Sequence, residues 1–375
     1  MSVTNISNTN RYILWGKSAG RCQYKGCNKT LFRDALTQGE FNQAYIAHIV
    51  ADVPGGPRGD EIKSDLLKDD LTNLMLMCDE HHRLIDRVDV DGHTIEKLME
   101  MKKEHEDRID KVASINPNMH SHIITYKANV GNHTPALTYE SVREFILPSH
   151  YPALPFAIDL SLSNSPQRDK DGSFWKTELE NIEIQFNEQL RPKFRKGEIL
   201  HLSVFAFAPM PLLIKLGTLI NDIQHSEIHQ PVRDPQTWNL SDEVQECIYI
   251  VTEPQKSFPI VALNISLSAS INNERITRVL GNDCSIYTLS IANPFNDFLK
   301  TKMQLQEFSI VVRKLLNHIK SKYDAQTPLH IFPAMPIATA IELGRIWMPK
   351  ADMPLLIFDE NTAVNGFLKA IEITN

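Results

Sequence analysis

The sequence predicts two domains, a small metal-stabilised domain over residues 1–112 and an α/β domain over residues 123–375, with a linker at 113–122. Three observations predict this division. Three of the five cysteines fall within the first hundred residues. From about residue 123 onward β-like and helical segments alternate, which is typical of an α/β domain with a largely parallel sheet. Between the two parts, the stretch ASINPNMHSH breaks the helical pattern and indicates a linker.

Composition and charge exclude several classes of protein. With 42% hydrophobic and 23% charged residues the chain resembles an ordinary globular protein. We find no long apolar run and no export signal in MSVTNISNTNRY, so we expect a cytoplasmic protein without a membrane span. The net charge of −7 argues against a surface that is basic throughout. Residues 1–58 are locally basic, which is consistent either with phosphate contact or with a solvated face of mixed charge.

The expected elements follow from hydrophobic periodicity. In the first domain we expect a β-like run AYIAHIV (44–50), a Gly/Pro-rich loop, a helical segment that ends in CDEHHRLID, and an amphipathic helix over 94–112. In the second domain we expect helices over 210–221, 299–320 and 336–346. Its β-like runs are HIITYKANV, ENIEIQF, ILHLSVFAFA, ECIYIV, PIVALNISLSA, SIYTLSIA, LHIFPA and PLLIFD.

A weak internal repeat occurs in the second domain. Residues 202–220 and 329–346 both contain a strand-like run, the pattern Phe-x-x-Met-Pro, an apolar helix and Leu-Gly. This pattern predicts two related halves, although two unrelated strand–Pro–helix units could resemble each other by chance. A helix that begins just after a strand is a natural site for anions and nucleotides.

Two ligand pairs in the first domain predict a structural zinc site. Cys22 and Cys27 are separated by four residues, and Cys78 and His81 by two. Four such nitrogen and sulfur ligands suit tetrahedral Zn²⁺. The alternative is that the cysteines are isolated buried thiols, and this is the interpretation we favour for Cys247 and Cys284.

His82 requires a separate explanation. Adjacent residues of a helix point about 100° apart, so His81 and His82 do not easily bind one ion together. Asp86 is four residues further on, on the face of His82, where it could orient the imidazole or assist a second metal. We therefore interpret the histidine pair as belonging to two sites, one structural and one catalytic.

The stretches GRCQYKGC, AHIVADVPGGPR and NLMLMCDEHHRLID resemble the HNH endonuclease motif in order and spacing. The resemblance implies an α+β fold of the ββα-metal class. It also implies that His48 is the general base, that Asn73 holds the site geometry, and that His82 binds a divalent metal such as Mg²⁺. Arg58 is a candidate phosphate contact.

One residue departs from that family's pattern. Many HNH enzymes carry an aspartate directly before the base histidine, and here the position is Ala47. Taken singly, His48 could be a core histidine and Asn73 a helix cap, and Arg58 could be solvated. The combination of His48, Asn73 and His82 favours the nuclease interpretation.

The second domain resembles a SAVED domain, a fused pair of CARF-like halves that senses cyclic oligonucleotides. The resemblance rests on VFAFAPMPLLIKLGTLI, RDPQTWNL and FPAMPIATAIELGRIWMPKADMPLLIFD. It implies a ligand site between the halves, with base stacking on Trp238. The further residues expected at this site are Pro209, Met210, Pro333, Met335, Arg345 and Lys350.

An HNH nuclease joined to a SAVED domain resembles effectors of the CBASS anti-phage systems. The resemblance implies that a cyclic di- or trinucleotide binds the second domain, drives homo-oligomerisation, and releases largely non-specific cleavage of double-stranded DNA. Two alternatives remain. One is a restriction-type HNH endonuclease whose second domain reads DNA or a modified base. The other is a zinc-stabilised binding protein without catalysis, which Ala47 keeps open.

Overall fold

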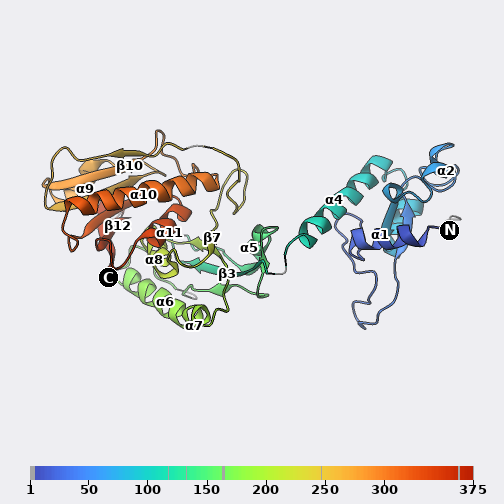
Figure 1. Ribbon diagram of the computed structural model, residues 1–375, viewed down its shortest axis with the longest axis horizontal. Helices are drawn as coiled ribbons and strands as arrows, with labels where there is room; N and C mark the ends of the chain where they lie inside the picture. Colours follow the sequence, from blue (N-terminus) through green and yellow to red (C-terminus); the bar gives the residue numbers. More distant parts are fainter. Residues whose placement is uncertain are drawn as a thin grey trace. The chain divides into compact units, whose positions relative to one another are not determined.

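The structure is a computed structural model that describes residues 5–116, 118–131, 133–162, 165–245, 247–361 and 364–374. It divides into an N-terminal unit, residues 1–117, and a C-terminal unit, residues 118–375 (Figure 1). The expected linker at 113–122 is shorter than predicted, because a helix ends at Ala113 and a strand begins at His120. Pro117, within that linker, lies outside the described residues.

A two-stranded antiparallel sheet followed at once by a helix forms the centre of the N-terminal unit. Strands β1 and β2 pair with His48 opposite Leu74, and α3 begins two residues after β2 ends. The predicted helical segment therefore begins later than its sequence suggested, because Leu74–Met77 is a buried strand. The elements in order are α1 (Asn8–Ser18), β1 (Tyr45–His48), α2 (Lys63–Leu67), the 3₁₀ turn η1 (Leu71–Asn73), β2 (Leu74–Met77), α3 (Asp79–Arg83), the π-helical turn η2 (Leu84–Val88) and α4 (Ile95–Ala113).

Strand β2 is the core of this unit. All four of its residues are fully buried, which explains why the run is apolar without alternation. Leu14 of α1 and Leu98 of α4 are also fully buried in the same cluster. This packing holds the cysteine-bearing loop and the start of α3 at the same, carboxyl end of β2, because Gln23 is hydrogen-bonded to Leu76 and α3 begins at Asp79.

The C-terminal unit contains two sheets. The first sheet has the order β4-β3-β6-β7, with β5 also paired to β3, and all its pairs are parallel. Its elements are β3 (His120–Lys127), α5 (Tyr139–Val142), the 3₁₀ turn η3 (Arg143–Ile146), β4 (Tyr151–Pro152), β5 (Ile158–Asp159), α6 (Phe174–Gln189), α7 (Arg191–Arg195), β6 (Leu202–Phe207), α8 (Met210–Ile220) and β7 (Ser226–Ile228).

The second sheet has six strands in the order β13-β12-β11-β9-β10-β8. Its central pairs are parallel, whereas the edge strands β8 and β13 are antiparallel to their neighbours. The sheet is therefore mixed. Its elements are β8 (Ile250–Thr252), β9 (Ile260–Ser266), α9 (Asn273–Leu280), β10 (Cys284–Ser290), α10 (Lys302–Lys322), β11 (Leu329–Ala334), α11 (Ile337–Ile346), β12 (Leu355–Asn361) and β13 (Gly366–Ile373).

One expected strand is wrong. ENIEIQF alternates apolar and polar residues, yet it lies inside helix α6. The buried residues of that helix are Phe174, Glu178, Ile182 and Phe186, spaced four apart, whereas Ile184 is half exposed. Helical spacing over 16 residues therefore outweighs alternation over seven.

The two copies of the repeat meet at their glycines. Helices α8 and α11 cross where Gly217 faces Gly344, and a Cβ on Gly217 would lie 2.0 Å from the carbonyl oxygen of Ile341. A Cβ on Gly344 would lie 1.9 Å from the carbonyl oxygen of Ile214. Each Leu-Gly of the repeat is therefore needed for this close helix contact, which joins the two halves of the C-terminal unit.

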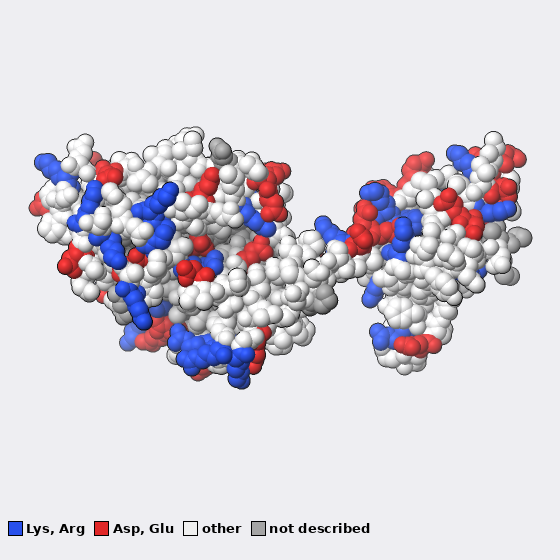
Figure 2. Space-filling view, viewed as in Figure 1, with Lys and Arg blue, Asp and Glu red and all other residues white. Residues whose placement is uncertain are grey.

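Charged side chains of both signs are interspersed on the visible face of the N-terminal unit (Figure 2). Several of its basic residues are paired, as Lys17 is with Glu106 and Lys25 with Glu104. The basic stretch at residues 1–58 is thus partly neutralised by acids of α4. Across the described part of the chain, helices fall short of the length and apolarity that a membrane span requires.

Candidate functional site

Cys22, Cys27, Cys78 and His81 form one cluster in the N-terminal unit, with their ligand atoms all within 4.8 Å of one another. The Nδ1 atom of His81 lies 3.1 Å from the Cys78 sulfur and 3.8 Å from the Cys22 sulfur. Ligands of a tetrahedral zinc ion with ~2.3 Å bonds are separated by somewhat under 4 Å. The donor set and its spacing therefore fit Zn²⁺, which would hold three thiolates and one imidazole.

Burial raises the pKa of the Cys22 thiol to about 12. The neighbouring thiols Cys78 and Cys27 raise it further, because additional thiolates would repel one another. Without a cation the Cys22 thiol is protonated at neutral pH. A bound Zn²⁺ would supply the positive charge that makes three adjacent thiolates stable.

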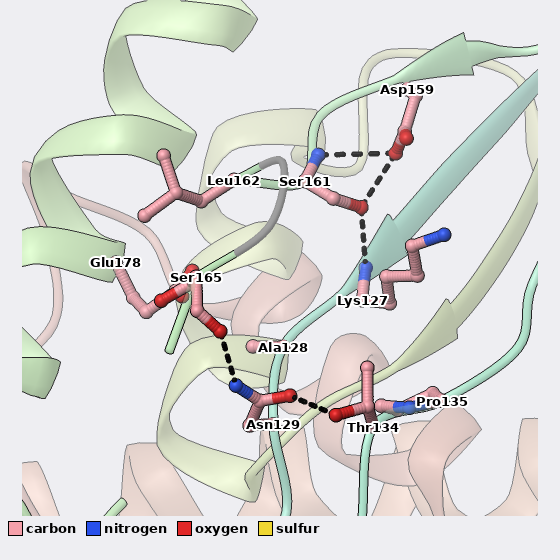
Figure 3. A pocket seen from close by; sticks show the side chains of 10 residues that line it. All are labelled: Lys127, Ala128, Asn129, Thr134, Pro135, Asp159, Ser161, Leu162, Ser165 and Glu178. Atoms are coloured by element: carbon pink, nitrogen blue, oxygen red, sulfur yellow. Dashed lines mark hydrogen bonds between the residues drawn. The ribbon is translucent and has the colours of Figure 1, made fainter. Parts of the chain in front are cut away.

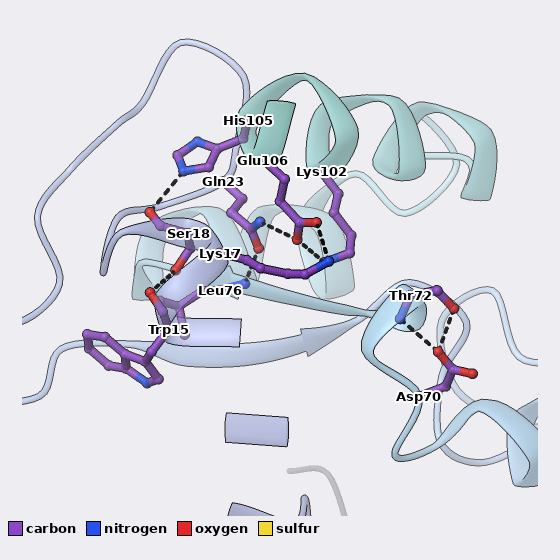
Figure 4. A network of polar contacts seen from close by, with 10 residues as sticks. All are labelled: Trp15, Lys17, Ser18, Gln23, Asp70, Thr72, Leu76, Lys102, His105 and Glu106. Carbon is purple, nitrogen blue, oxygen red and sulfur yellow. Dashed lines mark hydrogen bonds and ion pairs between the residues drawn. The ribbon is translucent and has the colours of Figure 1, made fainter. Parts of the chain in front are cut away.

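A polar network positions the cysteine loop (Figure 4). Gln23, next to Cys22, accepts a hydrogen bond from the Leu76 amide at 2.7 Å and donates to Glu106 of α4 at 3.2 Å. Glu106 also pairs with Lys102, whose ammonium pKa is lowered by burial. The network thus connects the loop to both β2 and α4.

A chain of aromatic contacts supports His81. Its ring stacks on Tyr24 with centroids 4.1 Å apart. His93 Nδ1 lies 2.6 Å from the carbonyl oxygen of Asp89, so this nitrogen carries the proton, and His93 Nε2 accepts from the Tyr24 hydroxyl at 3.0 Å. The face of His81 is therefore held by a fixed tyrosine.

His48 is the last residue of β1 and is 7% exposed. Its Nε2 lies 2.9 Å from the carbonyl oxygen of Lys68, which only accepts hydrogen bonds. The proton of a neutral His48 is therefore on Nε2. Nδ1 keeps its lone pair and has no hydrogen-bond partner among the described residues, so it is the atom that could take a proton from water.

Asn73 joins the loop after β1 to the start of β2. Its side-chain oxygen accepts from the Val50 amide at 2.7 Å, and its amide group donates to the carbonyl oxygens of Val50 at 2.8 Å and Leu67 at 3.1 Å. The side chain is buried and its hydrogen bonds are internal. Asn73 is therefore a positioning residue for the end of β1, where His48 lies.

Arg58 is not placed as a phosphate contact. Its side chain is only 6% exposed, and it donates to the carbonyl oxygens of Ile49 and Ile85, each at 2.7 Å. It also donates to Asp86 at 2.7 Å. The expectation of a solvent-facing loop arginine is wrong, because the backbone of the Gly/Pro-rich loop folds this side chain inward.

His82 has contacts separate from those of His81. Its ring stacks on Tyr45 at 5.1 Å, and its Nε2 lies 3.4 Å from Oδ2 of Asp86. Burial lowers the pKa of His82, while Asp86 opposes this shift. The two adjacent imidazoles therefore belong to two groups of residues, one with the cysteines and one with Asp86.

The second group fits a divalent ion in its donor types. Mg²⁺ usually keeps several waters and binds one or two protein oxygens together with substrate phosphates. Two neighbouring ligands with ~2.1 Å bonds to one ion lie about 3 Å apart, which is near the 3.4 Å between His82 and Asp86. At the position before His48, Ala47 is buried and supplies no ligand. His82 and Asp86 are the residues that would hold the ion.

The C-terminal unit contains a cavity of about 880 Å³ at the meeting point of the two repeats, which we call the central cavity. Met210 begins α8 and Met335 precedes α11, and the Met335 amide lies 3.4 Å from the Met210 sulfur. Both line the cavity, as do Phe207 at the end of β6 and Ile337 at the start of α11. The cavity therefore lies at the ends of strands and the beginnings of two helices, where the positive ends of the helix dipoles favour anions.

Comparison with protein families decides the assignment of this unit. Residues 182–373, just over half of the chain, match the family described as SMODS-associated and fused to various effectors sensor domain, or SAVED. The chain belongs to the SAVED family. The matched residues lie within the C-terminal unit, which we now call the SAVED unit.

Among solved structures, the SAVED/CARF-domain receptor Cap4 of Acinetobacter baumannii with the cyclic trinucleotide 2′3′3′-cAAA is 13% identical with a TM-score of 0.45, over 75% of this chain and 56% of that one. The same receptor with 3′3′3′-cAAA is 14% identical with a TM-score of 0.43, over 83% and 60%. Cap4 of Moraxella osloensis is 13% identical with a TM-score of 0.38, over 83% and 70%. This chain thus spans less than two thirds of the Acinetobacter receptor. No curated protein sequence matches it.

Three residues predicted for the SAVED ligand site line the central cavity, namely Met210, Trp238 and Met335. Trp238 is partly buried, with its ring edge-on to Phe205 at 5.5 Å, and Phe205 in turn stacks on His229. One part of the Trp238 ring system is therefore packed, while the residue still borders the cavity.

The other four predicted residues do not line this cavity. Pro209 is the buried N-cap of α8, and Pro333 is buried within β11. Arg345 binds Glu342 at 2.8 Å and the carbonyl oxygen of Asn221 at 3.2 Å, so its guanidinium is occupied. Lys350 is exposed in the turn after α11. Helix direction explains the two basic residues, since Arg345 lies in the last turn of α11 and Lys350 follows that helix, whereas its N-terminus faces the cavity.

Several residues that line the cavity could not be recognised from the sequence. Gln230 is 5% exposed and accepts from the Ala338 amide at 2.9 Å, which links the loop after β7 to the first turn of α11. Arg233 and Asp297 contribute from two separate loops, joined by a 3.2 Å hydrogen bond from the Arg233 amide. Hydrophobic periodicity predicts helices and strands, but it does not indicate which distant loops lie side by side, so these residues could not be predicted as neighbours.

Proposed function

We propose that the chain is a ligand-gated effector nuclease of CBASS-type antiviral defence. The SAVED unit binds a cyclic di- or trinucleotide, and the N-terminal unit then cuts double-stranded DNA. The observation that carries the sensor part is the central cavity between the two repeats, in a chain that belongs to the SAVED family.

The cavity suits a cyclic oligonucleotide in size and in chemistry. Its volume of about 880 Å³ is near the upper end of the ~300–1,000 Å³ range of small-molecule pockets. The positive ends of the α8 and α11 helix dipoles favour phosphate. Trp238 offers an aromatic face to a base, and Arg233 provides a positive charge at the rim. A ligand that contacts both halves would fix the positions of Met210 and Met335, and so of the two repeats, relative to each other.

The nuclease part rests on the arrangement around β1, β2 and α3. His48 Nδ1 would accept the proton of an attacking water, since Lys68 holds the proton of the neutral ring on Nε2. Asn73 and Arg58 hold the backbone at the end of β1. A divalent ion held by His82 and Asp86 would supply positive charge for the scissile phosphate and its leaving oxygen.

The charge of the single chain is the reason to expect that assembly controls DNA binding. A chain with a net charge of −7, whose N-terminal lysines are partly paired with acids, neutralises few phosphates by itself. Ligand-driven association of SAVED units would bring several N-terminal units to one DNA and raise affinity through multivalency.

Plasmid cleavage with Mg²⁺ and a panel of cyclic di- and trinucleotides, including the two cAAA isomers, tests the function. We expect general degradation with one compound and none without it. Discrete fragments without any ligand would establish the restriction-type alternative. No cleavage with a compound that binds tightly would establish the non-catalytic alternative, which Ala47 keeps open.

A further inference from the structure

A second cavity, which we call the side cavity, opens at the carboxyl ends of β3 and β5 in the SAVED unit (Figure 3). Its volume is about 310 Å³, within the range of small-molecule pockets. Lys127 and Asp159, the last residues of these parallel strands, line it together with Asn129, Ser165 and Glu178. In open α/β sheets ligands bind outside the carboxyl ends of the strands.

Most polar groups of the side cavity are already satisfied. The Asp159 carboxylate accepts from the amide and hydroxyl of Ser161, and the Asn129 amide group donates to the carbonyl oxygens of Ser165 and Gln167. Asn129 also accepts from Thr134 at 2.9 Å. The hydrogen bonds of these groups are made within the protein, so the groups form the wall of the cavity and do not need a ligand as a partner.

The carboxyl group of Glu178, in contrast, is not fully hydrogen-bonded within the described part of the chain. Glu178 comes from the second turn of α6, it is 1% exposed, and its Oε2 has no hydrogen-bond partner among the described residues. The hydroxyl of Ser165 is likewise buried and unpartnered there. Burial raises the pKa of the Glu178 carboxyl group to about 7. Because an unpaired buried acceptor destabilises a fold, this pair is best explained by a ligand that supplies N–H donors.

The side cavity adjoins the central cavity. Lys127 of β3 is the register partner of Phe207 of β6, and the first lines the side cavity while the second lines the central one. The segment after β3 borders both cavities, since Asn129 and Pro135 face the side cavity and Val130 and Ala136 the central one. The linings of the two cavities therefore meet at the end of β3 and along the segment that follows it.

We propose that the side cavity is a base-recognition subsite, in which Glu178 and Ser165 accept hydrogen bonds from the amino group of a nucleobase of the cyclic oligonucleotide. The proposal rests on the proposed sensor function and adds a preference for bases. Adenine, cytosine and guanine carry an exocyclic amino group, whereas uracil presents a carbonyl oxygen at the corresponding position. A cyclic oligonucleotide with an amino-bearing base should therefore bind more tightly than its all-uridine counterpart.

The test is calorimetric titration of the full chain with 3′3′3′-cyclic triadenylate, 2′3′3′-cyclic triadenylate and 3′3′3′-cyclic triuridylate. Glu178→Met keeps the side-chain length and removes the acceptor. Because it also removes an unpaired buried carboxyl group, we expect its unfolding temperature to equal or exceed that of the wild type. Glu180→Gln, at an exposed position of the same helix, is the matched control.

We expect the wild type to bind a triadenylate at least ~10-fold more tightly than the triuridylate, and Glu178→Met to lose that difference. Glu180→Gln should keep it. Equal triadenylate affinities for the wild type and Glu178→Met would overturn the subsite while leaving the sensor function intact. A wild type that binds none of the three compounds would overturn the sensor function for this ligand class and the subsite with it.

Discussion

Arg58 and Asp86 are joined by a 2.7 Å hydrogen bond that connects the loop after β1 to the π-helical turn after α3. The other oxygen of Asp86 lies 3.4 Å from His82, and Arg58 also reaches the carbonyl oxygen of His48 at 3.4 Å. One partly buried ion pair thus holds the two histidines of the candidate nuclease site in a common framework.

Replacement of Arg58 should therefore destabilise the N-terminal unit. In Arg58→Ala, Asp86 loses its partner and the carbonyl oxygens of Ile49 and Ile85 lose a donor, so we expect a loss of about 3 kcal/mol. Hydrogen exchange of the β1 and β2 amides measures this locally. Arg83→Ala, which breaks an exposed pair with Asp79, should cost at most about 1 kcal/mol. Equal effects of the two variants would contradict the role given to Arg58.

The cysteine cluster should hold zinc. We expect about one zinc ion per purified chain by atomic absorption, and Cys78→Ser should lose most of it. Cys284→Ser, which lies outside the cluster, should retain it. Zinc content that is unchanged in Cys78→Ser, or absent from the wild type, would contradict the assignment.

The SAVED unit should lose stability in acid because of His229. Burial lowers the pKa of this histidine to about 4, below its usual value of 6.5, so the folded state binds fewer protons than the unfolded state. The stability is present above pH ~6.5 and is lost as the pH falls towards 4, by roughly 3 kcal/mol. Urea unfolding between pH 7.5 and 4.5 measures the slope, which His229→Gln should flatten. An identical slope in the variant would assign the acid sensitivity to other groups.

Close contact of α8 with α11 requires glycine at two positions. Gly217→Ala would place a methyl group 2.0 Å from the carbonyl oxygen of Ile341, so the helices must separate, at a cost of about 3 kcal/mol. Gly172→Ala, whose new Cβ would meet nothing within 4 Å, is the control in the same unit. Urea unfolding that shows both variants unchanged would mean that the helices do not approach as closely as described.

The chemistry of the N-terminal unit could be predicted because metal ligands restrict residue type and spacing. Cys22, Cys27, Cys78 and His81 were picked from sequence and lie together in the structure. Arg58 was misjudged, because whether a loop arginine points outward depends on backbone geometry that sequence does not reveal. Arg58 has a left-handed φ of 57°, a conformation that residues other than glycine seldom adopt.

In the SAVED unit the repeat predicted two related halves, since proline marks the start of each helix and glycine, which has no Cβ, allows the two helices to approach closely. Met210 and Met335 were found in this way. Arg345 was not, because a charge that pairs locally with Glu342 resembles a phosphate ligand in sequence. Glu178 carries no signal in the sequence, since it lies in α6 just before the run 180–186 that alternation wrongly predicts as a strand.

The most direct test of the account is the rate of supercoiled plasmid cleavage by the full chain with Mg²⁺, with and without the cyclic nucleotide that binds the SAVED unit. We predict cleavage only with the ligand, a loss of at least ~100-fold in His48→Ala, and a higher ligand requirement in Trp238→Ala. Cleavage by the wild type at the same rate without ligand, or by His48→Ala as fast as by the wild type, would contradict the account.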